Sequence, residues 1–321
     1  MIPIIQIQNL RKTFVSGKAT VVAVDDISLA VNKGEIFGFL GPNGAGKTTT
    51  MRMLTTLLKP TSGLVEIAGY NLATEEEKVR TQLGYVSQSG GLERSASARE
   101  NLVLQARIFN FNKKEARQRA DELIKALELE SFADRLVSTY SGGQRRRTDL
   151  ALGMMHRPKI LFLDEPTVGL DPHSRAHLWG EIRKLRDQGT TIFVTTHYLD
   201  EADALCDRVA IVDHGRIVAL GTPSDLKREI GSDIILLGMS SDTVESLNTE
   251  KIFGALAGMR EIIKEKEGLR LLVQHGDTLL PQVLRLCDKA GIDLSAISLH
   301  RPTLDDVFLQ KTGRSFKQEN E

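Results

Sequence analysis

The sequence has no excess of charge of either sign, because its 42 lysines and arginines are matched by 42 aspartates and glutamates. A neutral chain without a lysine- or arginine-rich block gives no reason to expect nucleic acid as its main partner. Long apolar runs are missing too, and no stretch approaches the roughly 18 uninterrupted apolar residues that a membrane-spanning helix needs. We therefore expect no nucleic-acid partner, and at a membrane the spans would have to come from another chain.

Cysteine is scarce as well, since Cys206 and Cys287 are the only two. They lie far apart in unrelated contexts and make neither a metal-ligand spacing nor a disulfide framework, which fits a reducing cytosol. The first residues lack the basic flank of a secretory signal peptide and soon turn polar at Gln6. We expect a cytoplasmic location.

What the sequence does have is an alternation of strand and helix patterns in an ordinary globular composition. Strands are predicted at residues 4–10 and 21–31, and residues 36–40 form the wholly apolar run of a buried parallel strand. A helix follows over about 47–58. Strand patterns then stop at about 96–136, where apolar residues recur at helical spacing, so we predict a helical subdomain inserted into an α/β core.

The pattern of predicted strands and helices changes near residues 230–232, and a chain of 321 residues is long enough for two domains. We predict a larger α/β domain over 1–230, with its helical subdomain at about 89–140, and a smaller α+β domain over 231–313. Residues 314–321 read as a frayed tail. The smaller domain has the element order βαββαβ of ferredoxin-like folds, with strands near 234–239, 261–265, 269–274 and 294–299.

A glycine-rich loop stands between the strand at 36–40 and the helix after it. It fits G-x-x-x-x-G-K-[ST] at every fixed position, and its residues with the next threonine are Gly41, Pro42, Asn43, Gly44, Ala45, Gly46, Lys47, Thr48 and Thr49. Inward-facing N–H groups and the positive end of the helix dipole favour phosphate there. Lys47 is predicted to reach the β- and γ-phosphates, and the Thr48 hydroxyl to ligate Mg²⁺.

Two carboxylates, Asp164 and Glu165, end the apolar strand at 160–163. Asp164 is expected to bind Mg²⁺, directly or through water. Glu165 is placed to act as general base on the water that attacks the γ-phosphate. Joined to the glycine-rich loop, this pair indicates a nucleoside triphosphatase with a P-loop α/β fold.

A third motif can bind phosphate at another helix start, just upstream of the acidic strand. Its residues form a nest of inward-facing N–H groups and are Ser141, Gly142, Gly143 and Gln144. Two phosphate-binding helix ends in one chain suggest that a nucleotide lies between two copies. His197, which follows the strand at 191–196, can hydrogen-bond a γ-phosphate oxygen and register its presence.

These motifs together resemble the ATP-binding subunits of ABC transporters, over about residues 4–230. Residues 141–144 resemble the signature LSGGQ, with Tyr140 in place of its leucine. The other matches are Gln88 for the Q-loop glutamine and a further Mg²⁺ ligand, Asp171 for the D-loop, His197 for the switch histidine and Phe14 for the aromatic ring that stacks on adenine.

The resemblance implies an ATPase that uses ATP and Mg²⁺ and works as a head-to-tail dimer of two copies. It also implies a separate transmembrane permease, which would hold the chain at the inner face of the cell membrane. Residues 140–173 and 301–309 are most similar to export ATPases of the daunorubicin-resistance type, which serve drugs, antibiotics, lipids or polysaccharides.

Two alternatives stay open. Sugar-importer ATPases usually add a β-barrel domain, which the βαββαβ order argues against. Non-transport ABC ATPases of translation or DNA repair carry two cassettes or a long coiled-coil insertion, and this chain has one cassette with about forty inserted helical residues.

Overall fold

The computed structural model describes residues 3–16, 19–231, 233–240, 247–265 and 268–313. Contacts divide the chain into two compact units, Met1–Pro223 with the segment from Lys311 onward, and Ser224–Gln310. The first division lies somewhat N-terminal to the one predicted at residue 230. The tail predicted at 314–321 lies outside the described residues. None of the described helices combines the length and the apolarity needed to cross a membrane.

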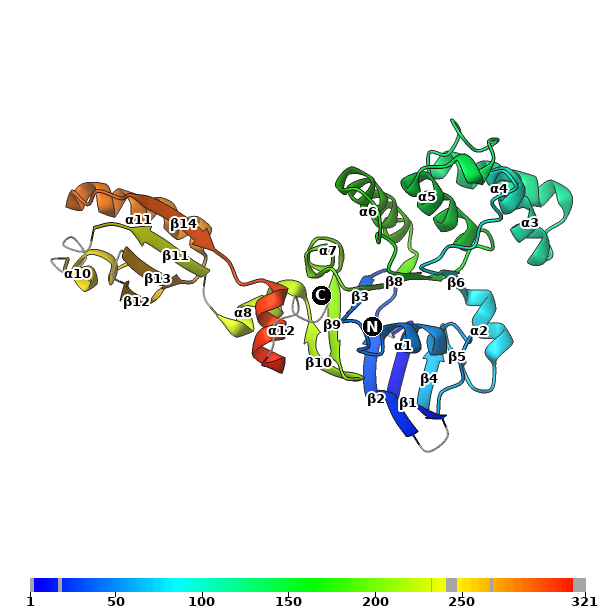
Figure 1. Ribbon diagram of the computed structural model, residues 1–321, viewed down its shortest axis with the longest axis horizontal. Coiled ribbons are helices and arrows are strands. Elements are labelled where there is room, and N and C mark those ends of the chain that lie inside the picture. The colour runs from blue at the N-terminus through cyan, green and yellow to red at the C-terminus, as the bar shows by residue number, and fades with distance from the viewer. Residues whose placement is uncertain (1–2, 17–18, 232, 241–246, 266–267, 314–321) are drawn as a thin grey trace. The chain divides into compact units, whose positions relative to one another are not determined.

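A six-stranded sheet forms the centre of the first unit and positions the phosphate loop (Figure 1). Its strands in spatial order are β10 (Arg216–Gly221), β9 (Arg208–Asp213), β3 (Ile36–Leu40), β8 (Thr191–Thr196), β7 (Ile160–Asp164) and β6 (Leu83–Val86). All neighbours are parallel except β10 and β9. Every residue of β3, β7 and β8 is buried, as expected of strands covered on both faces. Their carboxyl ends meet at one edge, so the loop, Glu165 and His197 are brought together there.

A second, antiparallel sheet of four strands completes this unit. Its order is β2 (Ala19–Val31), β1 (Ile5–Ser16), β4 (Ser62–Ile67) and β5 (Tyr70–Asn71). The strand predicted at 4–10 therefore continues to Ser16, past register shifts in its pairing with β2. Both sheets contribute to one apolar core, which includes Ile5 and Val65 from the second sheet and Phe39 and Phe162 from the first.

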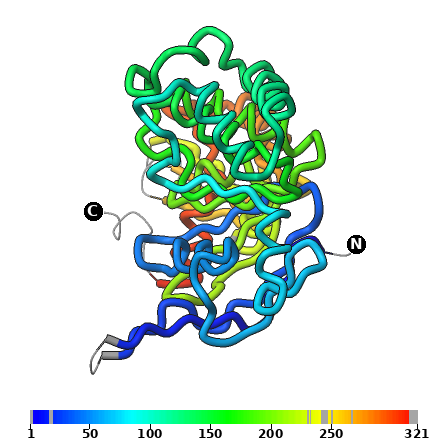
Figure 2. Tube along the Cα trace, turned by 90° about the vertical axis from the view of Figure 1, so that its right-hand side faces the viewer, coloured from blue at the N-terminus to red at the C-terminus, as the bar shows by residue number. Residues whose placement is uncertain are grey.

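The helices of the insertion are α3 (Ala98–Ile108) and α4 (Lys113–Ala126), followed by the short helix η1 (Val137–Thr139) and by α5 (Gly142–Gly153). Ser97 and Asn112 each close a capping box at the helix start, which fixes where α3 and α4 begin. Figures 1 and 2 show these helices at the end of the unit opposite strands β1 and β2. The inserted segment was predicted from residue 89, but it becomes helical only at Ala98.

The remaining helices of this unit are α1 (Lys47–Leu54), α2 (Glu76–Gln82), α6 (Pro172–Asp187) and α7 (Leu199–Leu205). The helix predicted over 47–58 is wrong at its end, because α1 stops at Leu54. Its next residues leave the helical conformation, with Thr56 at a positive φ of 62°. A β-branched residue in that region breaks the repeat of helical hydrogen bonds.

The second unit has the predicted βαββαβ order. Its elements are α8 (Pro223–Ile230), β11 (Asp233–Gly238), α10 (Thr249–Phe253), β12 (Met259–Glu265), β13 (Gly268–Val273), α11 (Gly276–Ala290), β14 (Ala296–His300) and α12 (Leu304–Thr312). The antiparallel sheet runs β12-β13-β11-β14, which is the ferredoxin-like order. Ile235, Phe253, Leu271 and Val283 belong to its own apolar core. The predicted fold, a P-loop cassette with a small α+β domain, is confirmed in both units.

Because the second unit has its own core, it can be weakened without touching the phosphate loop. Phe253 is fully buried in that core. We expect Phe253→Ala to lower the free energy of unfolding of this unit by about 3–5 kcal/mol, through lost burial and the cavity left behind. ATP affinity should stay unchanged, measured by nucleotide titration beside thermal unfolding. Loss of ATP binding in a variant whose first unit is folded would show that the second unit helps to form the nucleotide site.

Candidate active site

The loop between β3 and α1 has the backbone that a phosphate cradle requires. Gly44 and Gly46 have positive φ values of 82° and 99°. A Cβ atom on Gly46 would lie 2.4 Å from the carbonyl oxygen of Ala23, so no other residue fits without a shift. Gly46 is also the N-cap of α1 and offers no side chain to cap it. The N–H groups of the first turn are therefore available to an anion.

The Lys47 side chain is 5% exposed and turns back onto this loop. Its Nζ donates hydrogen bonds to the carbonyl oxygens of Gly41 at 2.7 Å and Pro42 at 3.0 Å. Burial lowers the pKa of Lys47, and the nearby charges of Glu165 and Asp164 oppose that effect. A buried ammonium group held by two carbonyls can exchange these partners for phosphate oxygens, which carry full charge.

A cavity of about 240 Å³ lies in front of the loop. Its lining brings together residues from three separate motifs and consists of Ala23, Asn43, Gly44, Gly46, Lys47, Thr48, Thr49, Gln88 and Glu165. The predicted loop, the glutamine at 88 and the glutamate at 165 thus face one space. Phe14, Ser141 and Asp171 are not among its lining residues.

The Glu165 carboxylate stands among three groups that other elements supply. Gln88 Nε2 donates to Oε2 at 3.0 Å, and Lys47 Nζ lies 3.8 Å from Oε1. His197 Nδ1 lies 3.2 Å from the same Oε1, although the geometry is not that of a hydrogen bond. The Glu165 backbone has a positive φ of 46°, an uncommon conformation that the surrounding bonds must stabilise. A carboxylate fixed in this way can accept a proton at a defined point.

Asp164 lies one residue earlier, at the end of β7, and is 4% exposed. Its Oδ1 accepts a hydrogen bond of 2.6 Å from Thr195 Oγ1, which holds the carboxylate to β8. Thr195 also receives the backbone N–H of Glu165, at 3.1 Å through its carbonyl oxygen and at 3.1 Å through its hydroxyl. The two acidic residues are therefore set by the same threonine on the neighbouring strand.

Ser141 is exposed and caps α5 rather than facing the cavity. Its Oγ accepts from Gln144 N at 3.2 Å, and Gln144 Oε1 accepts from Ser141 N at 3.0 Å. Gly143 allows a close approach to α6, because a Cβ there would lie 2.9 Å from Ser174 Oγ. Ser141, the predicted second phosphate-binding residue, is thus not among the residues that line the cavity at Lys47.

Asp171 and Phe14, which were predicted to contact the nucleotide, also lie outside the lining of this cavity. Asp171 caps α6 through the N–H and hydroxyl of Ser174, and these bonds lower the pKa of its carboxyl group. Phe14 lies on β1 with 42% of its surface exposed, and Lys12 Nζ stands 5.2 Å from its ring centre. An exposed ring is available for stacking, whereas a core phenylalanine would be covered.

Comparison with known proteins places these motifs in a family. A model described as ABC transporter matches residues 24–168, and one for the C-terminal domain of DrrA1-3-like ATP-binding proteins matches residues 221–312. The chain is 41% identical to the daunorubicin resistance ATP-binding protein DrrA3 of Streptomyces coeruleorubidus, over 91% of each chain. This chain belongs to the ATP-binding proteins of ABC transporters.

Other relatives extend the match. The linearmycin resistance ATP-binding protein LnrL of Bacillus subtilis is 34% identical over 98% of this chain and 99% of its own. The Nod factor export ATP-binding protein I of Ralstonia nicotianae is 37% identical over 98% and 95%. A solved dimeric ATP-binding cassette in a post-hydrolysis state with ADP and Pi aligns with a TM-score of 0.62 and 30% identity, over 68% of this chain and 98% of that one. The predicted ABC ATPase is confirmed at the level of family, fold and ATP hydrolysis.

Arg146 is the residue of this ABC ATPase site that the sequence analysis missed. It lies on α5, the residue is 7% exposed, and its guanidinium group donates hydrogen bonds to three backbone carbonyls. Nη2 donates to Glu165 O at 3.0 Å, Nε to Pro166 O at 2.8 Å and Nη1 to Ser87 O at 2.8 Å. One side chain of the signature helix therefore fixes both Glu165 and the residue before Gln88. In the sequence, the four-residue spacing between Arg146 and the apolar Leu150 indicates that both lie on the same face of the helix, which is the one sign that Arg146 is buried.

The role of Glu165 can be tested by an almost isosteric change. Glu165→Gln should keep ATP binding and lower kcat by about a hundredfold or more, because the amide cannot accept the proton. Lys47→Ala should weaken ATP binding as well, because it removes a positive charge from the phosphates. Steady-state ATPase rates and nucleotide titration distinguish the two results. Equal rates for wild type and Glu165→Gln would exclude the base role.

Because Arg146 bonds three backbone carbonyls at once, we expect that a lysine in its place keeps the positive charge but does not keep the full ATPase activity. In Arg146→Lys the compact ammonium group cannot reach three separated carbonyls, so Glu165 loses part of its support. We expect kcat to fall about tenfold, as a misplaced catalytic group predicts, with ATP affinity retained. Arg145→Lys, beside it on α5 and outside these three bonds, is the matched control. A normal kcat in folded Arg146→Lys would contradict the positioning role.

Proposed function

We propose that this chain is the ATPase subunit of an exporter, which drives a drug, antibiotic, lipid or polysaccharide through a separate membrane permease. The observation that carries the proposal is the match across both units, cassette and DrrA-like C-terminal domain, to relatives named for drug resistance and Nod factor export. The ferredoxin-like order of the second unit supports it further. An importer ATPase or a non-transport ATPase has no comparable support here.

ATP is the substrate, and the residues around the cavity divide the work of hydrolysis. Lys47 and the N–H groups of the loop hold the phosphates, where their charge neutralises the charge that builds up on the γ-phosphate. Glu165 accepts the proton of the attacking water as the bond between the water oxygen and phosphorus forms. The leaving group is ADP, and inorganic phosphate is the second product. His197 and Gln88, both beside Glu165, contact the water and the γ-phosphate.

The oxygen donors Thr48, Asp164 and Gln88 fit Mg²⁺, because hydroxyl, carboxylate and amide oxygens are the ligands that this hard cation prefers. The structure fits such an ion further, since the Asp164 carboxylate is buried and its hydrogen-bond partners, the hydroxyl groups of Thr195 and Tyr85, are neutral. When bound, the ion would neutralise phosphate charge in the transition state.

We propose further that each ATP is held between two copies of the chain, arranged head to tail. Ser141 caps the start of a helix, a place that favours phosphate, yet it is not among the residues that line the cavity at Lys47. Phe14 and Asp171, which also lie outside that lining, would contact the nucleotide or its surroundings in the assembled site. The similar cassette solved as a dimer with ADP and Pi supports this arrangement.

The permease would dock beside the inserted helices, on the face next to the segment that begins after Gln88. Phe109 at the end of α3 stacks on His156, with ring centres 3.9 Å apart, and His156 Nε2 lies 2.8 Å from Leu83 O on β6. Next to this stack lies a largely apolar hollow of about 250 Å³, to which the exposed Leu57 contributes. It can take an apolar side chain from a short permease helix.

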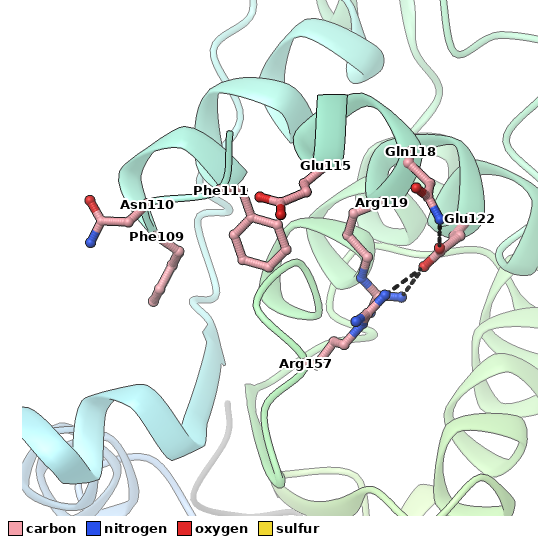
Figure 3. A pocket seen from close by; sticks show the side chains of 8 residues that line it. All are labelled: Phe109, Asn110, Phe111, Glu115, Gln118, Arg119, Glu122 and Arg157. Carbon is pink, nitrogen blue, oxygen red and sulfur yellow. Dashed lines mark hydrogen bonds and ion pairs between the residues drawn. The ribbon is translucent and has the colours of Figure 1, made fainter. Parts of the chain in front are cut away.

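A second hollow of about 460 Å³ adjoins the first, since Phe109 lines both. Figure 3 shows Arg119 and Arg157 pointing toward Glu122, which pairs with each of them at 3.1 Å. Its polar lining suits the charged flank of the same permease segment. Position and chemistry together make these two hollows the proposed link between nucleotide and partner.

Gln88 connects that face to the nucleotide, so its loss should uncouple the two. We expect Gln88→Ala to lower ATP-driven transport in vesicles by about tenfold, a usual size for coupling between sites. The ATPase rate of the isolated subunit should fall less, because Lys47 and Glu165 are intact. Gln6→Ala, at an exposed glutamine of β1, is the control. Full transport by Gln88→Ala would count against the proposed coupling.

A further inference from the structure

Glu201 on α7 is a fully buried carboxylate that neither the phosphate cavity nor the signature helix uses. Among the described residues no ion pair compensates its charge; its partners are two neutral donors. Trp179 Nε1 donates to Oε1 at 2.9 Å, and Thr196 Oγ1 donates to Oε2 at 2.6 Å. A buried carboxyl group without a counter-ion is costly, and its neighbours Leu199, Ala202 and Leu205 show that apolar residues fill the same space.

The two donors place Glu201 directly behind the switch histidine. Thr196 precedes His197, and its hydroxyl also accepts the backbone N–H of Tyr198 at 3.0 Å, so the residues on both sides of His197 are tied to one carboxylate. The Tyr198 ring lies 4.1 Å from the His197 ring, between centres. The contacts of Thr196 and Tyr198 thus restrict the orientation of the His197 ring, whose Nδ1 faces Glu165.

The second donor, Trp179, links this arrangement to a neighbouring helix. Trp179 lies on α6, the helix that Asp171 caps. The same helix supplies Arg175, whose guanidinium carbon stands 4.8 Å from the Tyr198 ring centre. Two contacts therefore join the helix after Asp171 to the residues around His197.

We propose that Glu201 is a positioning residue for ATP hydrolysis, which acts through His197 by fixing Thr196 and Tyr198 against Trp179. The inference rests on the proposed role of His197 at the γ-phosphate. The competing role is purely structural: Glu201 is the third residue of α7, and through Thr196 it satisfies the N–H of the N-cap Tyr198, as a capping box would. The two roles predict different kinetics.

Two variants remove the same link by different means. In Glu201→Gln the amide N–H₂ faces one of the two donors, and in Thr196→Val the hydroxyl is gone while the Trp179 bond is kept. Both should lower kcat on the order of tenfold to a hundredfold, because His197 is displaced, and leave KM for ATP within about twofold. Glu181→Gln, a glutamate on α6 that is 2% exposed, is the matched control and should turn over normally.

The one tryptophan of the chain supplies a direct spectroscopic readout. Its emission should shift in Glu201→Gln, where its acceptor changes, and should stay unchanged in Thr196→Val. If both variants only lower the melting temperature and keep the wild-type kcat, Glu201 is a helix cap and the proposal is overturned.

A double variant separates this inference from the role of His197 itself. Residual hydrolysis in single-turnover assays should be the same for His197→Ala and for His197→Ala with Glu201→Gln, since the link then has nothing to position. A further loss in the double variant would overturn the proposal. Wild-type turnover by His197→Ala would instead remove the proposed role of His197, whatever Glu201→Gln does.

Discussion

The buried guanidinium group of Arg146 holds the catalytic site together. It bonds the carbonyls of Glu165, Pro166 and Ser87 from within α5, whose first turn is the signature. A buried arginine stays charged and has five donors in a rigid fork, so it can fix three peptide groups at once. A movement of the signature end of α5 is therefore transmitted to Glu165, the proposed general base, and to the segment that carries Gln88.

The electrostatics of the cavity follow from this arrangement. Glu165 is held in a left-handed backbone conformation, with Lys47, Gln88 and His197 around its carboxylate. Lys47 rests on two loop carbonyls, and burial favours its neutral form, so phosphate oxygens offer it a stronger partner. In the proposed mechanism, Lys47 and the N–H groups of the loop bind the phosphates, and the carboxylates of Asp164 and Glu165 serve Mg²⁺ and the attacking water.

Much of the fold was predictable because its strongest patterns are buried on both faces. The apolar run at 36–40 became β3 with the predicted bounds, and the loop after it allows few alternatives. Weakly patterned elements were missed: β4 exposes Leu64, and Val79 is the one buried residue of α2. For Arg146 the helical spacing to Leu150 indicates burial at most, and its bonds could not be predicted because its partners are backbone carbonyls, which any residue type can supply.

The most direct test of the shared site mixes two damaged chains in a Glu165→Gln background, where bound ATP is trapped rather than hydrolysed. One chain carries Lys47→Ala and the other Ser141→Arg, and the mixed dimer is isolated. If each site joins Lys47 of one copy to Ser141 of the other, one interface carries both lesions and the other is intact, so ATP is occluded at one site. With both lesions in one chain and a wild-type partner, each shared site is damaged and occlusion is lost. The reverse pattern, with no occluded ATP in the first mixture and occlusion in the second, would contradict a nucleotide site shared between two copies.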